Sequence, residues 1–119
     1  MAQIHLTDRA LLDIEEIYEY SIEKWGEKTA ERYLDQIQDS LLTLEENPQL
    51  LLQKPEISNR FKLYQTGAHW LICDVVDNDI FVLTIKHLSL NLLDRLKTLE
   101  PTLEEEVNFL YQKALRSRG

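Results

Sequence analysis

The sequence predicts an α+β domain in which an N-terminal helical hairpin packs on a small twisted antiparallel sheet, with additional helices at the C-terminal end. Three patterns predict this order. Apolar residues recur at helical spacing through residues 8–46, β-rich stretches separated by turn residues occupy 60–87, and helical spacing returns over 89–116. Because 119 residues suit one domain with one modest core, we expect a single domain over residues 1–119.

The N-terminal elements are bounded by residues with clear capping roles. Residues 1–6 predict a short strand, and Thr7 can cap the next helix by accepting an amide hydrogen bond from its first turn. Gly26 suits the end of that helix, because glycine adopts left-handed conformations at little cost. Asn47-Pro48 ends the second helix, since proline disfavours helical backbone in the residue before it. The two apolar stripes are Leu11, Ile14, Ile17, Tyr18, Ile22 and Trp25, then Ala30, Tyr33, Leu34, Ile37, Leu41 and Leu44.

The strand region has the pattern of an antiparallel meander. Residues 49–59 predict a loop, because Pro55 excludes regular structure there. Strands are expected at 60–65, 69–76 and 80–87, since turn residues separate them at Thr66-Gly67 and at 77–79.

Side chains alternate along a strand, so the last two strands define two faces of the sheet. One face is uniformly apolar and is expected to receive the helices: Leu71, Cys73, Val75, Phe81, Leu83 and Ile85. The other face is mixed and is where a ligand could lie: Trp70, Ile72, Asp74, Val76, Ile80, Val82, Thr84 and Lys86.

The last part of the chain predicts two helices within 89–116. Ser89 can cap the first, Pro101 ends it, and Thr102 with Glu105 forms a capping-box pattern at the start of the second. Their apolar stripes are Leu92, Leu93, Leu96 and Leu99, then Val107, Leu110, Tyr111, Ala114 and Leu115.

The formal net charge is −8, and its distribution is uneven. Residues 1–46 hold twelve acidic and four basic side chains, whereas acids and bases balance in the remainder. The predicted hairpin therefore carries all of the excess negative charge. A field of this sign repels nucleic acid but leaves room for a small basic groove on the sheet.

Other features narrow the class of protein. No apolar stretch approaches the roughly 20 residues that span a bilayer, and the first residues lack a signal-peptide pattern, so we expect a cytoplasmic protein without membrane contact. The single cysteine, Cys73, can form neither an internal disulfide nor a cysteine metal cluster. Three glycines in all exclude a phosphate-binding glycine loop. We therefore expect no metal and no cofactor.

Together these stretches resemble the RelE/ParE superfamily, the toxins of bacterial toxin–antitoxin and plasmid-stabilisation modules. The matching segments are 13–20, 25–34, 44–48 and the last two strands, which close on Ile85-Lys86-His87. The resemblance covers residues 3–90 and implies a cognate antitoxin encoded by a neighbouring gene. It also implies one of two activities. In the RNase branch, basic residues on the open sheet face bind mRNA at the ribosome, and in the ParE branch, members act on DNA gyrase without cutting RNA.

The sequence departs from the RNase branch where that branch carries positive charge. Trp70 and Thr84 stand where arginines are usual, and Leu88-Ser89 replaces the basic pair that often follows the closing histidine. By the alternation above, Trp70, Asp74 and Thr84 are expected to share the open face. The basic residues of the RNase branch are therefore interpreted as missing, which leaves open whether the chain is an enzyme.

Five side chains remain as candidates for a site. Lys86 and His87 are the catalytic candidates, because histidine titrates near neutral pH, although a strand-end histidine more often bonds backbone. Arg60 and Lys62 could bind phosphate, or could simply form a solvated strand surface. Trp70 could anchor a partner, or could be covered by the C-terminal helices.

Three hypotheses for function follow. The first is a toxin of a type II toxin–antitoxin module that binds a protein target such as DNA gyrase, with its antitoxin as partner. The second is a ribosome-dependent mRNA endoribonuclease with a rearranged site made from Lys86, His87, Arg60 and Lys62. The third is a non-toxic, degenerate interaction module, and a homodimer is left open throughout.

Overall fold

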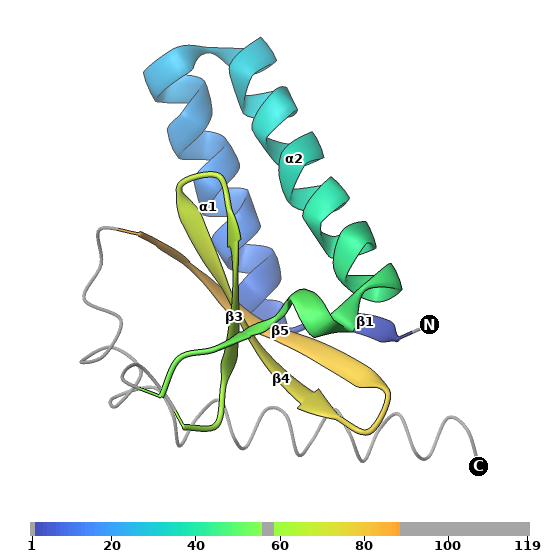
Figure 1. Ribbon diagram of the computed structural model, residues 1–119. Coiled ribbons are helices and arrows are strands. Elements are labelled where there is room, and N and C mark those ends of the chain that lie inside the picture. Colours follow the sequence, from blue (N-terminus) through green and yellow to red (C-terminus); the bar gives the residue numbers. More distant parts are fainter. Residues whose placement is uncertain (1, 56–58, 89–119) are drawn as a thin grey trace.

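The computed structural model describes residues 2–55 and 59–88, in which a helical hairpin lies on one face of a five-stranded sheet (Figure 1). The predicted C-terminal helices at 89–116 fall outside the described residues. The elements in chain order are β1 (Gln3–Leu6), α1 (Asp8–Trp25), α2 (Glu27–Glu46), a 3-10 turn η1 (Pro48–Leu50), β2 (Leu52–Gln53), β3 (Lys62–Thr66), β4 (His69–Val76) and β5 (Asp79–His87).

The predicted caps of the hairpin are present. Thr7 Oγ1 accepts a hydrogen bond from the Ala10 amide at 3.0 Å and donates one to the Leu83 carbonyl at 2.7 Å. The cap therefore satisfies an orphan amide of α1 and also joins the start of that helix to β5. Gly26, with φ of 93°, separates the two helices, as its position in the sequence predicts.

The sheet is mixed, so the prediction of an antiparallel sheet is wrong for one strand. The strand order is β1-β5-β4-β3-β2, and β1 pairs in parallel with β5, with Gln3 opposite Asp79 and Leu6 opposite Val82. The other pairs are antiparallel. Turn residues in the sequence predict antiparallel pairing only between strands that follow each other in the chain. β1 and β5 are separated by the helical hairpin and by three other strands, so no turn predicts their pairing.

The segment predicted as an unstructured loop contains a further short strand. Leu52 and Gln53 form β2, which pairs with Leu63 and Lys62 of β3 at the edge of the sheet. Two residues are too few to show a period of two, so the sequence pattern could not reveal them.

A β-bulge reverses part of the predicted face assignment. Ile72 lies opposite Thr84 and Cys73 lies opposite Val82, which leaves Leu83 as an extra residue in β5. Ile80 and Val82 consequently belong to the core beneath the helices, together with Leu71, Cys73 and Ile85. Phe81 and Leu83, expected on that face, alternate with these residues and lie on the opposite face.

Thr84, which was expected on the open face, lies opposite Ile72 and reaches α1 at the edge of β5 that β1 leaves free. Its hydroxyl donates a hydrogen bond to the Asp13 carboxylate of α1.

The hairpin is less deeply buried than its apolar stripes predict. Leu11 and Trp25 of α1 are 50% and 59% exposed, while the buried helix residues of the core are small or aliphatic.

The β3–β4 turn is held against α2 by a close approach that only glycine allows. Gly67 has φ of 56°, and a Cβ there would lie 2.5 Å from Tyr33 Cε1. We expect Gly67→Ala to lower the free energy of unfolding by about 1–3 kcal/mol, measured by urea denaturation. Gly26→Ala is the matched control, because Gly26 also has positive φ but no atom within 4 Å of a Cβ. An equal loss in both variants would contradict a role for the Tyr33 contact.

Candidate functional site

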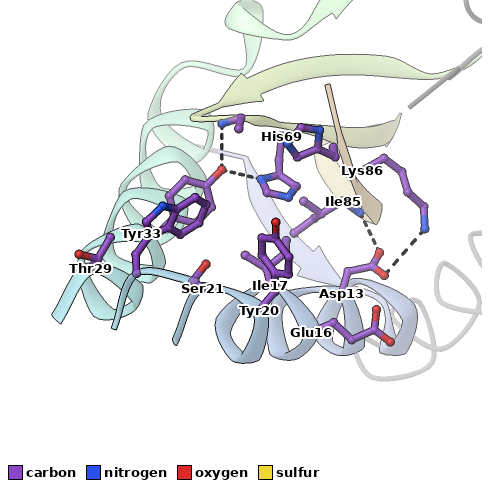
Figure 2. A pocket seen from close by; sticks show the side chains of 13 residues that line it. Asp13, Glu16, Ile17, Tyr20, Ser21, Thr29, Tyr33, His69, Ile85 and Lys86 are labelled. Carbon is purple, nitrogen blue, oxygen red and sulfur yellow. Dashed lines mark hydrogen bonds and ion pairs between the residues drawn. The ribbon is translucent and has the colours of Figure 1, made fainter. Parts of the chain in front are cut away.

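A cleft of about 830 Å³ opens where the hairpin meets the ends of β4 and β5 (Figure 2). Its walls come from α1, from the start of α2, from the β3–β4 turn and from the last residues of β5. The lining is largely aromatic and aliphatic, with a few polar groups, which is the usual composition of a binding site. Its polar, charged and aromatic lining includes Asp13, Glu16, Tyr20, Trp25, Tyr33, His69, Lys86 and His87.

Asp13 ties α1 to the free edge of β5 at one end of the cleft. Its carboxylate accepts a hydrogen bond from the Ile85 amide at 2.9 Å and another from the Thr84 hydroxyl. Lys86 Nζ lies 3.9 Å from the other carboxylate oxygen (Figure 2). β1 ends opposite Val82, so the Ile85 amide has no strand partner on this side and the carboxylate takes that place.

Tyr33 and His69 form the polar centre of the cleft. Tyr33 Oη accepts a hydrogen bond from the Ala68 amide at 2.9 Å and lies 2.5 Å from His69 Nδ1 (Figure 2). It also lies 3.2 Å from the Thr66 carbonyl. The phenol carries one proton. Either it donates to His69 Nδ1, or His69 donates to Tyr33 while Tyr33 donates to Thr66. Both arrangements fix the β3–β4 turn on α2.

The environment keeps both groups neutral near pH 7. Burial raises the pKa of Tyr33, opposed by the Ala68 amide. Burial lowers the pKa of His69 below its ordinary value of 6.5, and positive charge on His87 lowers it further, while Asp13 opposes this. The His69 and His87 rings meet edge to face, with centroids 5.2 Å apart. Protonation of His69 is therefore unfavourable in the folded protein.

The lowered pKa of His69 makes stability depend on pH. Below about pH 6.5 the unfolded chain binds a proton at this residue that the folded chain resists, so the free energy of unfolding falls as pH decreases. The contribution is fully present above pH 6.5 and is lost between that pH and the lower pKa of folded His69. Urea denaturation at pH 5 and 7.5 is expected to show a smaller decrease for His69→Gln than for the unmodified chain. Identical decreases would contradict this assignment.

Two exposed aromatic side chains stand at the mouth of the cleft. Tyr20 and Trp25 are 55% and 59% exposed, and their rings meet edge to face with centroids 5.9 Å apart. Glu16 lies one turn earlier on α1 and adds negative charge. Tryptophan and tyrosine with open faces are the side chains that most often anchor protein partners.

The candidates from the sequence do not gather at one place on the sheet. Lys86 and His87 line the cleft. Arg60 lies on the opposite face, where Nη2 and Nε contact Asp74 Oδ2 at 2.9 and 3.0 Å. Trp70 alternates with the core residue Leu71 and therefore also faces away from the hairpin, with Lys54 Nζ 5.8 Å from its ring centroid.

Lys62 does not join Lys86 either. It begins β3 opposite Cys73, whereas Lys86 pairs with Trp70, which lies opposite Gln65. The separation is three residues along β3, or about 10 Å, before any difference of face is counted. The arrangement therefore does not bring the four residues proposed for a rearranged nuclease site together.

Features of metal or redox chemistry do not appear in the described part of the chain. Residues 2–55 and 59–88 contain no group of three histidine, cysteine or acidic side chains placed to hold a metal ion. Cys73 is fully buried, and burial raises the pKa of its thiol, which keeps it protonated and unreactive. In the same ranges, no helix is both long and apolar enough to cross a membrane.

Sequence reasoning missed the centre of the cleft. Tyr33 was assigned to the apolar stripe of α2, and neither His69 nor Asp13 was among the candidate site residues. The meeting of Tyr33 with His69 depends on packing between distant segments and has no local signature.

The fold and the cleft define this chain as a small α+β domain of the RelE/ParE toxin class, with a two-helix hairpin on a mixed sheet. It belongs to the ParE toxin family, since residues 4–90 match the family described as ParE toxin of type II toxin-antitoxin system, parDE. The resemblance seen in the sequence is thereby confirmed. A toxin of this system implies a cognate ParD antitoxin as partner.

A solved structure supports the fold. The structure described as "Chromosomal ParDE TA system from P. aeruginosa" is similar, with a TM-score of 0.66 and 16% sequence identity. The match covers 75% of this chain and 98% of that chain. At this identity it establishes the fold alone. No curated protein matches this chain.

Proposed function

We propose that this chain acts in the bacterial cytoplasm as a toxin that binds a protein target, with DNA gyrase the leading candidate, rather than as a nuclease. The observation that carries the proposal is the distribution of cations around the sheet. Arg60 is bound to Asp74 on the face away from the hairpin, and Lys86 lies beside Asp13 at the free edge of β5. Stabilising a phosphodiester transition state needs several cations converging on one point.

The character of the cleft supports a protein target. Its mouth carries Tyr20 and Trp25, and its floor carries the Tyr33–His69 pair, which is rigid because several hydrogen bonds fix it. Asp13 and Glu16 give the rim negative charge, as the hairpin has overall, which disfavours RNA and suits a partner with basic side chains.

Inducible expression in a bacterial host tests the proposal, with growth, plasmid supercoiling and mRNA integrity recorded in the same cultures. We expect growth arrest with intact mRNA, and loss of gyrase supercoiling when purified protein is added. Arrest with cut mRNA would overturn the proposal. Normal growth with abundant soluble protein would favour the non-toxic interaction module instead.

One observation favours the nuclease as a second candidate function. Lys86 and His87 share the cleft with His69 and Tyr33, so groups able to transfer protons lie near one cation. Translation-coupled mRNA cleavage that is lost in Lys86→Ala and His87→Ala would support this activity. Absence of cleavage by the unmodified protein would end it.

A further inference from the structure

The sheet has a second apolar face, opposite the hairpin. Phe81 and Leu83 of β5 lie on it, as do Ile72 of β4 and Leu63 of β3, since each alternates with residues of the core under the helices. All four side chains have 0% of their surface exposed. Both α-helices of the described residues lie on the other face (Figure 1). This face is therefore buried by something other than the hairpin.

The free energy of exposing these four side chains to water means that the second face must be covered. A fully buried leucine, isoleucine or phenylalanine is stabilised by about 1.5–3 kcal/mol relative to an exposed one. Four such side chains left in water would cost roughly 6–12 kcal/mol, which is comparable to the whole stability of a small domain. The face must be closed whenever the protein is folded.

We propose that residues 89–119 of the same chain dock on this face, formed by Leu63, Ile72, Phe81 and Leu83. The segment continues directly from Leu88, which follows β5, so it starts at the edge of the surface that it would cover. Its 31 residues would extend about 45 Å even if entirely helical, more than the roughly 30 Å of the nine-residue strand β5. Length therefore permits full cover.

The composition of the segment also fits this face. Residues 89–119 carry two apolar stripes, at Leu92 to Leu99 and at Val107 to Leu115. They hold five acidic and five basic side chains, so they bring no net charge to a face whose Arg60 and Asp74 already neutralise each other. The excess negative charge of the molecule is on the hairpin, across the sheet.

The consequence is that the two faces of this domain have different roles. The second face is occupied from within the chain, and the cleft beside the hairpin is the side left for partners. The proposal does not depend on the identity of the target, because it concerns only which segment closes the sheet.

Photocrosslinking in the full-length chain tests it. The photoreactive residue p-benzoylphenylalanine replaces Trp70, which borders the second face, in an equal mixture of isotopically light and heavy protein. We expect crosslinks from this position to residues 89–119 within molecules of one label. The same residue in place of Trp25, at the mouth of the cleft, is the control and should not crosslink to that segment. Crosslinks that join light to heavy chains, or that reach only residues 2–88, would overturn the proposal.

A second variant pair tests whether the segment docks through its apolar stripe. Leu110→Asp places a charge in the apolar stripe, whereas Asn108→Asp places one beside it. The crosslink yield from position 70 is expected to fall several-fold in Leu110→Asp and to stay unchanged in Asn108→Asp. An equal yield in both variants would contradict docking through this stripe.

Discussion

Replacing Asp13 with alanine is expected to lower the free energy of unfolding by about 3 kcal/mol. The change removes the acceptor of the Thr84 hydroxyl, which is fully buried, and of the Ile85 amide at the free edge of β5. Each buried donor left without a partner costs about 1–3 kcal/mol. For a domain of this size the loss corresponds to a decrease in Tm of roughly 10 °C, measurable by circular dichroism.

Two variants separate this effect from the loss of a surface charge. Glu16→Ala removes an exposed carboxylate one turn further along the same helix and is expected to change stability by less than about 0.5 kcal/mol. Asp13→Asn keeps one oxygen acceptor and should fall between the two. A loss in Asp13→Ala no larger than that in Glu16→Ala would show that the carboxylate does not hold α1 to β5.

The local boundaries of the fold are predictable from the sequence because single residues determine them. Thr7 and Gly26 limit α1 through a cap and a backbone conformation, and both effects act within a few residues. The parallel pairing of β1 with β5 is different, since it joins Gln3 to Asp79 across the whole hairpin. The local sequence of neither strand predicts that they pair in parallel.

The bulge at Leu83 shows a second reason why the sequence does not predict the whole fold. One extra residue in β5 reverses which of its side chains face the helices, and the apolar sequence from Ile80 to Leu83 fits either choice equally well. Alternation therefore identified the strand but not its faces. Ile85, which follows the bulge, faces the helices as predicted, so the reversal affects only the residues before the bulge.

The candidate site was predictable only in part. Lys86 and His87 were proposed because they end a strand of a recognisable type, and in the structure both line the cleft. Asp13, Tyr33 and His69 were not found as site residues because their roles arise from contacts between α1, α2 and the sheet. Burial then sets the pKa of His69, and burial is a property of the assembled fold.

Replacing Tyr20 and Trp25 together with serine is expected to abolish growth arrest while leaving the fold intact. Both side chains are more than half exposed and contact each other at the mouth of the cleft, so their removal costs little stability. An aromatic anchor at an interface typically contributes about 2 kcal/mol, and its loss weakens a complex about 30-fold. Colony counts after induction, with Tm recorded for the purified variant, measure both effects.

The matched control is Leu12→Ser. Leu12 is 58% exposed on the same helix but does not line the cleft, so its replacement removes comparable apolar surface at a different place. Toxicity is expected to persist in this variant. If Leu12→Ser relieved growth arrest as fully as the double variant, the effect would come from general loss of exposed apolar surface, and the target would not bind at the cleft. If neither relieved it, the toxic contact would depend on neither Leu12 nor the aromatic pair, and the aromatic pair would have another role.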